Sequence, residues 1–380
     1  MNTPLRLASA RPSMLLLAAM ICTLLFVRHS VGAELPTEVR ADLDARIAAF
    51  MEKSKTPGLS AAFVVDHELL YERGYGLADI ENNVPATPDT VYRLASISKM
   101  LTAVGAMQLV EAGSLDLAAP VQQYVPGFPE KQAPITCELL LKHQSGIRHY
   151  KGDEVRSAKA YPHVSDSFAV FQDDPLLFNP GEKFSYTTYG FNLVGAVIEG
   201  ASGEDYVDYM LEHVCRPAGM VNIRPDSPAK IIPHRAAGYR KSGPVLVNDI
   251  AVDISNKIPG GGWCATPGEL ARFAIALCQG KLVSAESLEQ MWTPQKTAGG
   301  EQTNVGYGCF IDALDGDRLI SHSGGQPKVS TFLVFSPSKK TAVALMCNLR
   351  GAGLKPLALE LMGVLGKAGV ETASVPAKAP

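Results

Sequence analysis

The stretch VYRLASISKMLTAVGAMQLVEA, residues 91–112, contains the most informative pattern in the chain. A segment with arginine and tyrosine, Val91–Ala95, leads into Ser96-Ile97-Ser98-Lys99, and an apolar run follows from Met100 to Ala112. This order predicts a strand end, a turn and a long buried helix that opens at Ser96. Positions three apart lie on one face of a helix, so the Ser96 hydroxyl and the Lys99 amine can approach to hydrogen-bond distance.

The surroundings of this pair make it a candidate nucleophile and general base. An apolar surround and the positive end of a helix dipole both disfavour an ammonium group, which predicts a lowered pKa for Lys99. A neutral amine can then take the proton of Ser96. The same spacing occurs at Ser227 and Ser336, but there a proline follows the serine directly in a polar, turn-like segment. The alternative is a helix-capping serine followed by a surface lysine.

Residues 1–33 are predicted to be a signal peptide. Arginines precede an apolar stretch from Met14 to Val27, and Val31-Gly32-Ala33 is a small-x-small cleavage site. We expect cleavage after Ala33, a secreted or periplasmic protein, and no stable membrane span after cleavage. An uncleaved membrane anchor and a mitochondrial presequence are the alternatives.

Composition narrows the class of protein. The chain is 46% apolar and has a formal net charge of −3 without a dense cluster of lysine and arginine, which argues against a nucleic-acid partner. Six cysteines lie beyond the leader, scattered in mostly apolar segments, and are predicted to be buried free thiols. The eight histidines form no zinc-type spacing. We therefore expect neither a metal nor another cofactor.

Strand patterns occupy both ends of the chain and helix patterns the middle. A helix over 38–51 and a hairpin over 59–65 and 69–75 come first. Strands return over 306–314, 318–322, 330–335 and 341–347, before a last helix over 354–365. The predicted fold class is α+β, with one antiparallel sheet built from both chain ends, flanked by helices, and an inserted helical lobe.

The expected domain layout follows from this order. One catalytic domain spans 34–368, with an α/β lobe over about 34–114 and 292–368 and a helical lobe over about 115–291. The Ala/Pro-rich residues 369–380 are predicted to be a disordered tail. A cleft between the lobes is the default place for a site.

Two further segments supply groups that a serine-lysine pair needs. Tyr186 follows Pro180-Gly181, and a phenol near cationic groups is predicted to have a lowered pKa and to relay protons to a leaving group. His322 lies on a strand before Gly324-Gly325, where strand N–H groups, that of Gly325 included, can bind a developing oxyanion together with the Ser96 N–H. The alternatives are a packing aromatic for Tyr186 and a structural histidine for His322.

With these segments in view, the sequence resembles the serine β-lactamase and penicillin-binding-protein superfamily, in its class C-like branch. The matching motifs occur in the family's order over roughly residues 36–368, and they are Ser96-x-x-Lys99, 135–147, 180–195, 260–273, 306–308 and 322–325. Residues 146–150 and 173–178 are similar to the subgroup related to the animal mitochondrial serine β-lactamase-like protein. The resemblance implies a β-lactamase/transpeptidase-like fold and acyl-enzyme chemistry.

This chain departs from the antibiotic-degrading members at two motifs. Their Tyr-x-Asn is Tyr186-Thr187-Thr188 here, and their Lys-Thr-Gly is His322-Ser323-Gly324. The resemblance therefore places Thr188, Ser323 and Gly324 at the substrate, where a titratable imidazole replaces a permanent cation. Lys328 either restores positive charge near the substrate or is a solvated loop residue.

These observations predict a serine hydrolase. Ser96, Lys99, Tyr186 and His322 are the expected catalytic residues, and an ester, amide or peptide is the expected small-molecule or peptide substrate, with β-lactam hydrolysis weak at most. The alternative is a penicillin-binding sensor or scaffold without turnover. Self-assembly, as in filaments of the mitochondrial relative, is compatible with either.

Overall fold

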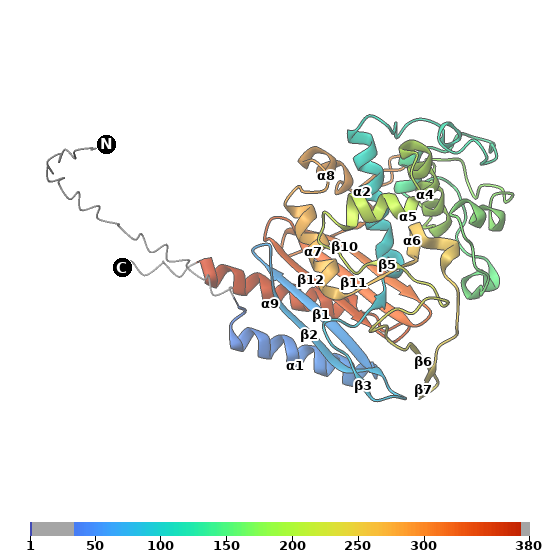
Figure 1. Cartoon of the computed structure of the whole chain (residues 1–380). Helices are drawn as coiled ribbons and strands as arrows, with labels where there is room; N and C mark the ends of the chain where they lie inside the picture. The colour runs from blue at the N-terminus through green and yellow to red at the C-terminus, as the bar shows by residue number, and fades with distance from the viewer. Residues whose placement is uncertain (2–33, 374–380) are drawn as a thin grey trace. The chain divides into compact units, whose positions relative to one another are not determined.

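A computed structural model describes the chain from Glu34 to Ala373; residues 2–33 and 374–380, which include the predicted signal peptide and most of the predicted tail, lie outside the described part. The described part is built on a seven-stranded antiparallel sheet in the order β3-β2-β1-β12-β11-β10-β9 (Figure 1). Its strands are β1 (Gly58–Val65), β2 (Glu68–Asp79), β3 (Val84–Pro85), β9 (Phe310–Leu314), β10 (Asp317–Gln326), β11 (Val329–Ser336) and β12 (Thr341–Cys347). The sheet joins the two halves of the chain because β1 pairs with β12, from Leu59 opposite Cys347 to Val64 opposite Ala342.

The sheet is covered on both faces. Helices α1 (Thr37–Ser54) and α9 (Lys355–Ala373) lie along one face, and α7 (Pro267–Cys278) packs against β1 and β12 on the other (Figure 1). Successive residues of a strand point to opposite faces. Accordingly Phe63 packs with Leu43 of α1 and Leu361 of α9, whereas its neighbour Val64 belongs to the second core. This double burial explains why every residue of β1, β11 and β12 is buried and why these strands are mostly apolar, with serine and threonine as their only polar residues.

Besides α2 (Ser98–Glu111), which carries Lys99, the chain forms several further elements. The helices among them are α3 (Cys137–Leu141), α4 (Thr188–Ser202), α5 (Tyr206–Tyr209), α6 (Ile258–Gly261) and α8 (Ala285–Met291). Two small sheets complete the fold: β4 (Tyr92–Arg93) with β8 (Trp263–Ala265) and β5 (Arg224–Pro225), and a hairpin of β6 (Tyr239–Ser242) and β7 (Val245–Asn248). Helix α2 packs against α4 and α6, and both of its sides are buried.

The α+β class and the large antiparallel sheet flanked by helices are confirmed. Several boundaries differ from the predictions. β9 begins at Phe310 rather than 306 and β10 extends to Gln326, while α5 is followed by a wider π-type turn over Met210–Cys215. The middle of the chain also contributes β5 to β8, which are too short to show a strand period.

The proposed lobe boundaries near residues 114 and 291 stay a prediction. Helix α7 falls within the predicted helical lobe, yet it packs on the sheet. Helix α9 continues to Ala373, so residues 369–373 of the predicted tail are helical. The six cysteines of the described residues are free thiols, and all but Cys278 are buried. Within residues 34–373, no helix has both the length and the apolar character needed to cross a bilayer.

Asn348 joins the ends of three strands. It follows β12 and is fully buried, and its Oδ1 accepts a hydrogen bond from the Gly58 N–H at 2.9 Å. Its Nδ2 donates to the carbonyls of Leu77 at 3.0 Å and Ala78 at 3.2 Å. One side chain thus satisfies backbone groups of β1 and β2 at the end of β12.

We predict that Asn348→Ala lowers the free energy of unfolding by about 2–4 kcal/mol, because buried backbone groups lose their partners at about 1–3 kcal/mol each. Urea unfolding followed by circular dichroism measures the change. Asn222→Ala is the matched control, because Asn222 is exposed and its side chain makes no hydrogen bond within the described residues. An Asn348→Ala protein as stable as the control would contradict this account of the strand ends.

Candidate active site

Ser96 lies on a sharp turn between β4 and α2. A 3₁₀ turn over Ala95–Ile97 connects the two elements, and Ala95 has a φ of 48°, which is unusual for a residue other than glycine. Strand β10 approaches this turn closely at Gly324, where an added Cβ would lie 2.3 Å from the Leu94 carbonyl oxygen and 2.0 Å from Thr331 Oγ1. Glycine is therefore needed at 324 for β10 to reach the Ser96 turn. Ser96 itself stays partly exposed and lines a cavity.

Lys99 lies beneath Ser96, one helical turn along. Its side chain is fully buried, and Nζ is 3.3 Å from Ser96 Oγ, 3.2 Å from Thr188 Oγ1 and 2.5 Å from the carbonyl oxygen of Gly260. Burial holds the pKa of Lys99 well below its usual value, and the nearby charge of Lys257 lowers it further. The structure thus agrees with the lowered lysine pKa expected from the sequence, and it adds a second cause.

Tyr186 faces the same pair from the segment before α4. Its ring centroid is 4.9 Å from Lys99 Nζ, and a hydrogen bond with Ser96 contributes to its titration. Burial raises the pKa of Tyr186, and the bond to Ser96 offsets this only in part. The predicted lowering of the tyrosine pKa is therefore wrong, because loss of water around the phenol outweighs the hydrogen bond with Ser96. Tyr186 stays protonated at neutral pH.

His322 reaches the cavity from β10. Its side chain is 2% exposed, Nδ1 is 2.6 Å from the Ser323 carbonyl oxygen, and Nε2 is buried without a hydrogen-bond partner in the described residues. Since a carbonyl only accepts, Nδ1 carries the proton and Nε2 has a free lone pair. Burial, followed by the charge of Lys99, lowers the pKa of His322 to about 3. The expected titratable imidazole is thus a neutral one throughout the physiological range.

The cavity has a volume of about 350 Å³ and brings most of the predicted residues together. Six of them line it: Ser96, Tyr186, Thr188, His322, Ser323 and Gly325. Nothing lies within 4 Å of a Cβ built at Gly325, so its backbone borders open space. Gly324 instead faces the Ser96 turn, and Lys99 lies under the floor. Lys328 does not line this cavity.

Sequence reasoning missed several residues of the site. His149 and Tyr150 line the cavity, and the His149 Nδ1 accepts a hydrogen bond from the Thr188 N–H at 3.1 Å. Burial, together with the charges of Lys99 and Lys257, lowers the pKa of His149 to about 4. Lys257 is itself buried, with Nζ 4.8 Å from the centre of the Tyr150 ring and a pKa lowered to about 8, mainly by burial. No local pattern marks Lys257, because its partners are 107 or more positions away in the sequence.

The sequence of this chain is similar to known proteins over most of its length. The model of the beta-lactamase family matches residues 43–363. The chain is 29% identical to the human serine beta-lactamase-like protein LACTB, mitochondrial, over 80% of this chain and 76% of the human protein. It is 31% identical to penicillin-binding protein 4* of Bacillus subtilis over 73% of this chain and 65% of that protein.

Solved structures show the same fold. The octameric penicillin-binding protein homologue from Pyrococcus abyssi aligns with a TM-score of 0.75 and 28% identity over 86% of this chain and 77% of the archaeal one. A D-amino acid amidase from Ochrobactrum anthropi aligns with a TM-score of 0.73 over 88% of this chain and all of that one (100%), at 23% identity, which supports the fold alone. With a family model that matches from α1 to α9 and with these relatives, the chain belongs to the beta-lactamase family.

Proposed function

We propose that this protein is a serine hydrolase that forms an acyl-enzyme through Ser96. The observation that carries the proposal is the buried Lys99 amine at 3.3 Å from Ser96 Oγ. A neutral amine has two N–H groups and one lone pair. The Gly260 carbonyl can only accept, and the Thr188 hydroxyl can accept as well, so these two neighbours engage both N–H groups. The lone pair is left for the Ser96 hydroxyl proton, as general-base catalysis requires.

The remaining residues suit the later steps of acyl transfer. Ser96 Oγ forms a bond to the substrate carbonyl carbon as Lys99 takes the serine proton. The N–H groups of Ser96 and Gly325 are the proposed oxyanion donors. The carbonyl carbon then releases the leaving group, which leaves protonated through Tyr186; a phenol with a raised pKa is a proton donor at rest, consistent with this role. Protonated Lys99 then returns a proton to Tyr186, which restores both groups. Water attacks the carbonyl carbon of the Ser96 ester and gives a proton to Lys99; the bond to Ser96 Oγ breaks, and Lys99 passes this proton to Ser96 as the carboxylic acid leaves.

The neutral state of His322 favours a substrate that places an uncharged group next to this side chain. A β-lactam or a peptide with a free carboxylate calls for a fixed cation at this place, whereas His322 is neutral and Thr188 replaces the amide of the second motif. An ester, amide or peptide substrate that also carries a hydroxyl or N–H group fits better, because that group can donate a hydrogen bond to the unpartnered Nε2 of His322.

Location and assembly follow from the relatives by analogy. The mammalian proteins are named mitochondrial, which supports the alternative of a mitochondrial leader over residues 1–33. Export through a signal peptide remains the first prediction from the sequence itself. The octameric archaeal homologue supports self-assembly of this chain.

We predict that Ser96→Ala lowers hydrolysis of an activated ester at least about 10³-fold and abolishes labelling by a fluorophosphonate probe, because the nucleophile is lost. Peptide mass mapping of the wild-type adduct should locate the label on Ser96, with little labelling by a fluorescent penicillin. Ser98→Ala is the matched control, since Ser98 lies two residues on, is buried and has no hydrogen-bond partner for its Oγ in the described residues. Full activity in Ser96→Ala would exclude the proposed mechanism, and strong penicillin labelling without turnover would favour a penicillin-binding sensor.

A second prediction concerns the pH dependence of kcat/KM. The base form of Lys99 is the active one, so activity falls as pH falls through the pKa of Lys99. Lys257→Met removes a positive neighbour, which raises the pKa of Lys99 and moves the acid limb of the profile to higher pH. The difference should vanish above pH 8, because the pKa of Lys257 is about 8 and its charge is lost there. Lys183→Met, at an exposed lysine, should keep the wild-type profile; superimposable profiles for both variants would refute a role for Lys257.

A further inference from the structure

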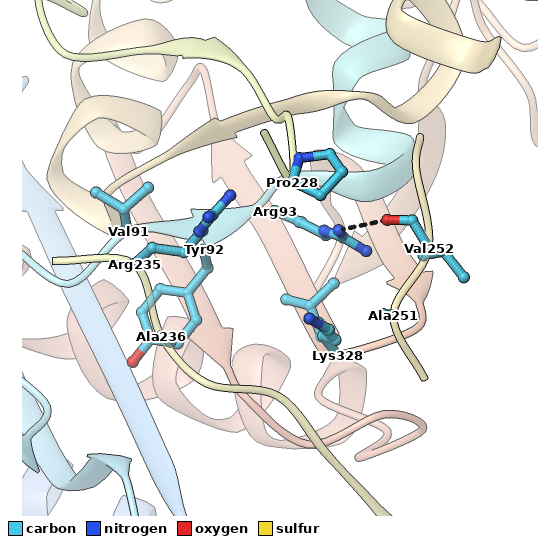
Figure 2. Close-up of a pocket in the computed structure, with 10 residues that line it drawn as sticks. Val91, Tyr92, Arg93, Pro228, Arg235, Ala236, Ala251, Val252 and Lys328 are labelled. Atoms are coloured by element: carbon cyan, nitrogen blue, oxygen red, sulfur yellow. Dashed lines mark hydrogen bonds between the residues drawn. The ribbon is translucent and has the colours of Figure 1, made fainter. Parts of the chain in front are cut away.

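A second cavity lies behind the Ser96 turn. It has a volume of about 180 Å³ and is lined by β4, by the start of β11 and by the segments around residues 235 and 251 (Figure 2). It shares no lining residue with the Ser96 cavity. Three cationic side chains line it, from Arg93, Arg235 and Lys328, and no acidic side chain does.

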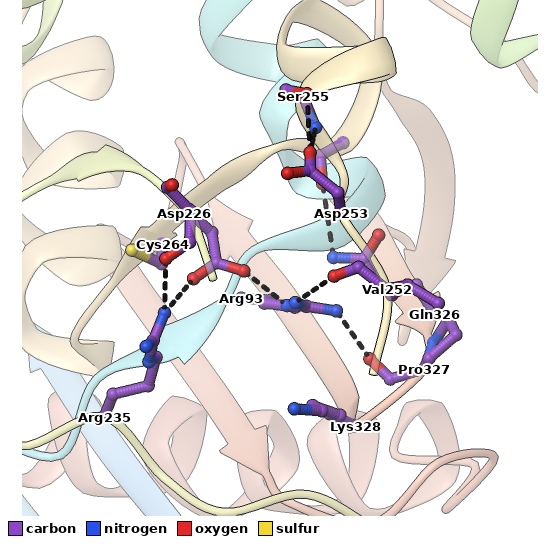
Figure 3. A network of polar contacts seen from close by, with 12 residues as sticks. Arg93, Asp226, Arg235, Val252, Asp253, Ser255, Cys264, Gln326, Pro327 and Lys328 are labelled. Carbon is purple, nitrogen blue, oxygen red and sulfur yellow. Dashed lines mark hydrogen bonds and ion pairs between the residues drawn. The ribbon is translucent and has the colours of Figure 1, made fainter. Parts of the chain in front are cut away.

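One buried carboxylate serves two of these cations. Asp226 is fully buried, and its oxygens accept from Arg93 Nε at 2.7 Å and from Arg235 Nη1 at 2.9 Å (Figure 3). The other contacts of the two guanidinium groups are to neutral carbonyl oxygens. Arg93 donates to those of Val252 at 3.2 Å and Pro327 at 3.4 Å, and Arg235 donates to those of Ser227 at 2.9 Å and Lys230 at 3.3 Å. One negative charge therefore faces two positive charges before Lys328 is counted.

Lys328 adds a third positively charged side chain to this cavity. Within residues 34–373, its Nζ makes no hydrogen bond or ion pair; only its backbone N–H is used, donating to Asp249 Oδ2 at 2.7 Å. The other oxygen of Asp249 lies near Arg240 at 3.9 Å and Arg350 at 3.7 Å. The Asp249 carboxylate therefore interacts with two arginines and with the Lys328 backbone, and it makes no ion pair with the Lys328 ammonium group.

The backbone holds Lys328 in this place. The residue has a φ of 78°, and its stem lies against Gly238, where an added Cβ would be 2.1 Å from Lys328 Cβ. Figure 2 shows Lys328 and the guanidinium of Arg93 on the same cavity. Burial and the charges of Arg93 and Arg235 lower the pKa of Lys328, while Asp226 and Asp249 act in the opposite direction. An anion placed here would relieve this repulsion.

We propose that this cavity is a binding site for a small oxyanion, namely a carboxylate or phosphate group. Guanidinium and ammonium groups are the side chains that bind such oxygens most strongly, and burial strengthens their charge-assisted hydrogen bonds. The cavity is large enough for one such group and has no lining carboxylate to repel it.

The site adjoins the Ser96 cavity through shared chain segments. Arg93 is three residues before Ser96, and it donates to the Pro327 carbonyl next to Gln326. Gln326 lines the Ser96 cavity and donates through Nε2 to the Gly261 carbonyl at 3.3 Å. The proposed anion therefore binds next to the Ser96 turn and not at Ser96 itself, so its binding does not require the Ser96 hydroxyl.

Isothermal titration calorimetry of the full chain at constant ionic strength tests the site, with inorganic phosphate and acetate as separate titrants against chloride. We expect saturable binding of phosphate or acetate with one site per chain, and the two titrants tell which oxyanion is preferred. Lys328→Gln should weaken binding at least about tenfold, as expected for loss of a buried charge-assisted contact. Lys340→Gln is the matched control, because this exposed lysine has a similar φ of 55° and lies outside the cavity.

Thermal unfolding without anion checks that each variant folds. If Lys328→Gln does not fold, Arg235→Gln takes its place in the titration. The Ser96→Ala protein should bind as the wild type does, so this test succeeds or fails independently of the proposed hydrolase activity. Absence of saturable binding to the wild type, or wild-type affinity in a folded Lys328→Gln protein, would overturn the proposal.

Discussion

The arrangement of this protein depends on a lysine amine that is sealed from water directly beneath a partly exposed serine. An ammonium group at this depth would be strongly disfavoured by the loss of hydration. The burial of Lys99 therefore turns its amine into a base, and the carbonyl of Gly260 and the hydroxyl of Thr188 hold the amine in position. Each supporting element has to stay in place, because movement of α4 or α6 would let water reach the amine.

The sheet supplies the rigid frame for this arrangement. β1 and β12, from opposite ends of the chain, lie at its centre and are buried on both faces, so the frame forms only when the two halves of the chain have met. Strand β10 then carries His322 and Gly325 past the Ser96 turn, and the missing side chain of Gly324 sets how close the strand can come. The site is thus positioned by backbone packing as much as by polar contacts.

The two cavities on either side of the Ser96 turn differ in their electrostatics. In the first, His149, His322 and Lys99 have lowered pKa values because burial and mutual repulsion disfavour their charged forms. In the second, arginine cannot lose its proton, so the positive charge of Arg93 and Arg235 persists and only Asp226 balances it. Both cavities have several basic side chains. In the Ser96 cavity these side chains are neutral and offer lone pairs, whereas in the cavity of Arg93 and Arg235 they stay positively charged.

The sequence alone determined the sheet from both chain ends, the helix that begins near Ser96, and three of the segments that line its cavity, those of Ser96, Tyr186 and His322. These features rest on local periodicity, turn residues and motif spacing, all of which are readable along the chain. Only the tertiary structure decided the ionisation of the site: a raised pKa for Tyr186, a neutral His322, and a second buried lysine at 257. It also decided that Lys328 belongs to a different cavity from Ser96. Desolvation and charge repulsion depend on which distant segments exclude water from a group, and that is established only when the chain has folded.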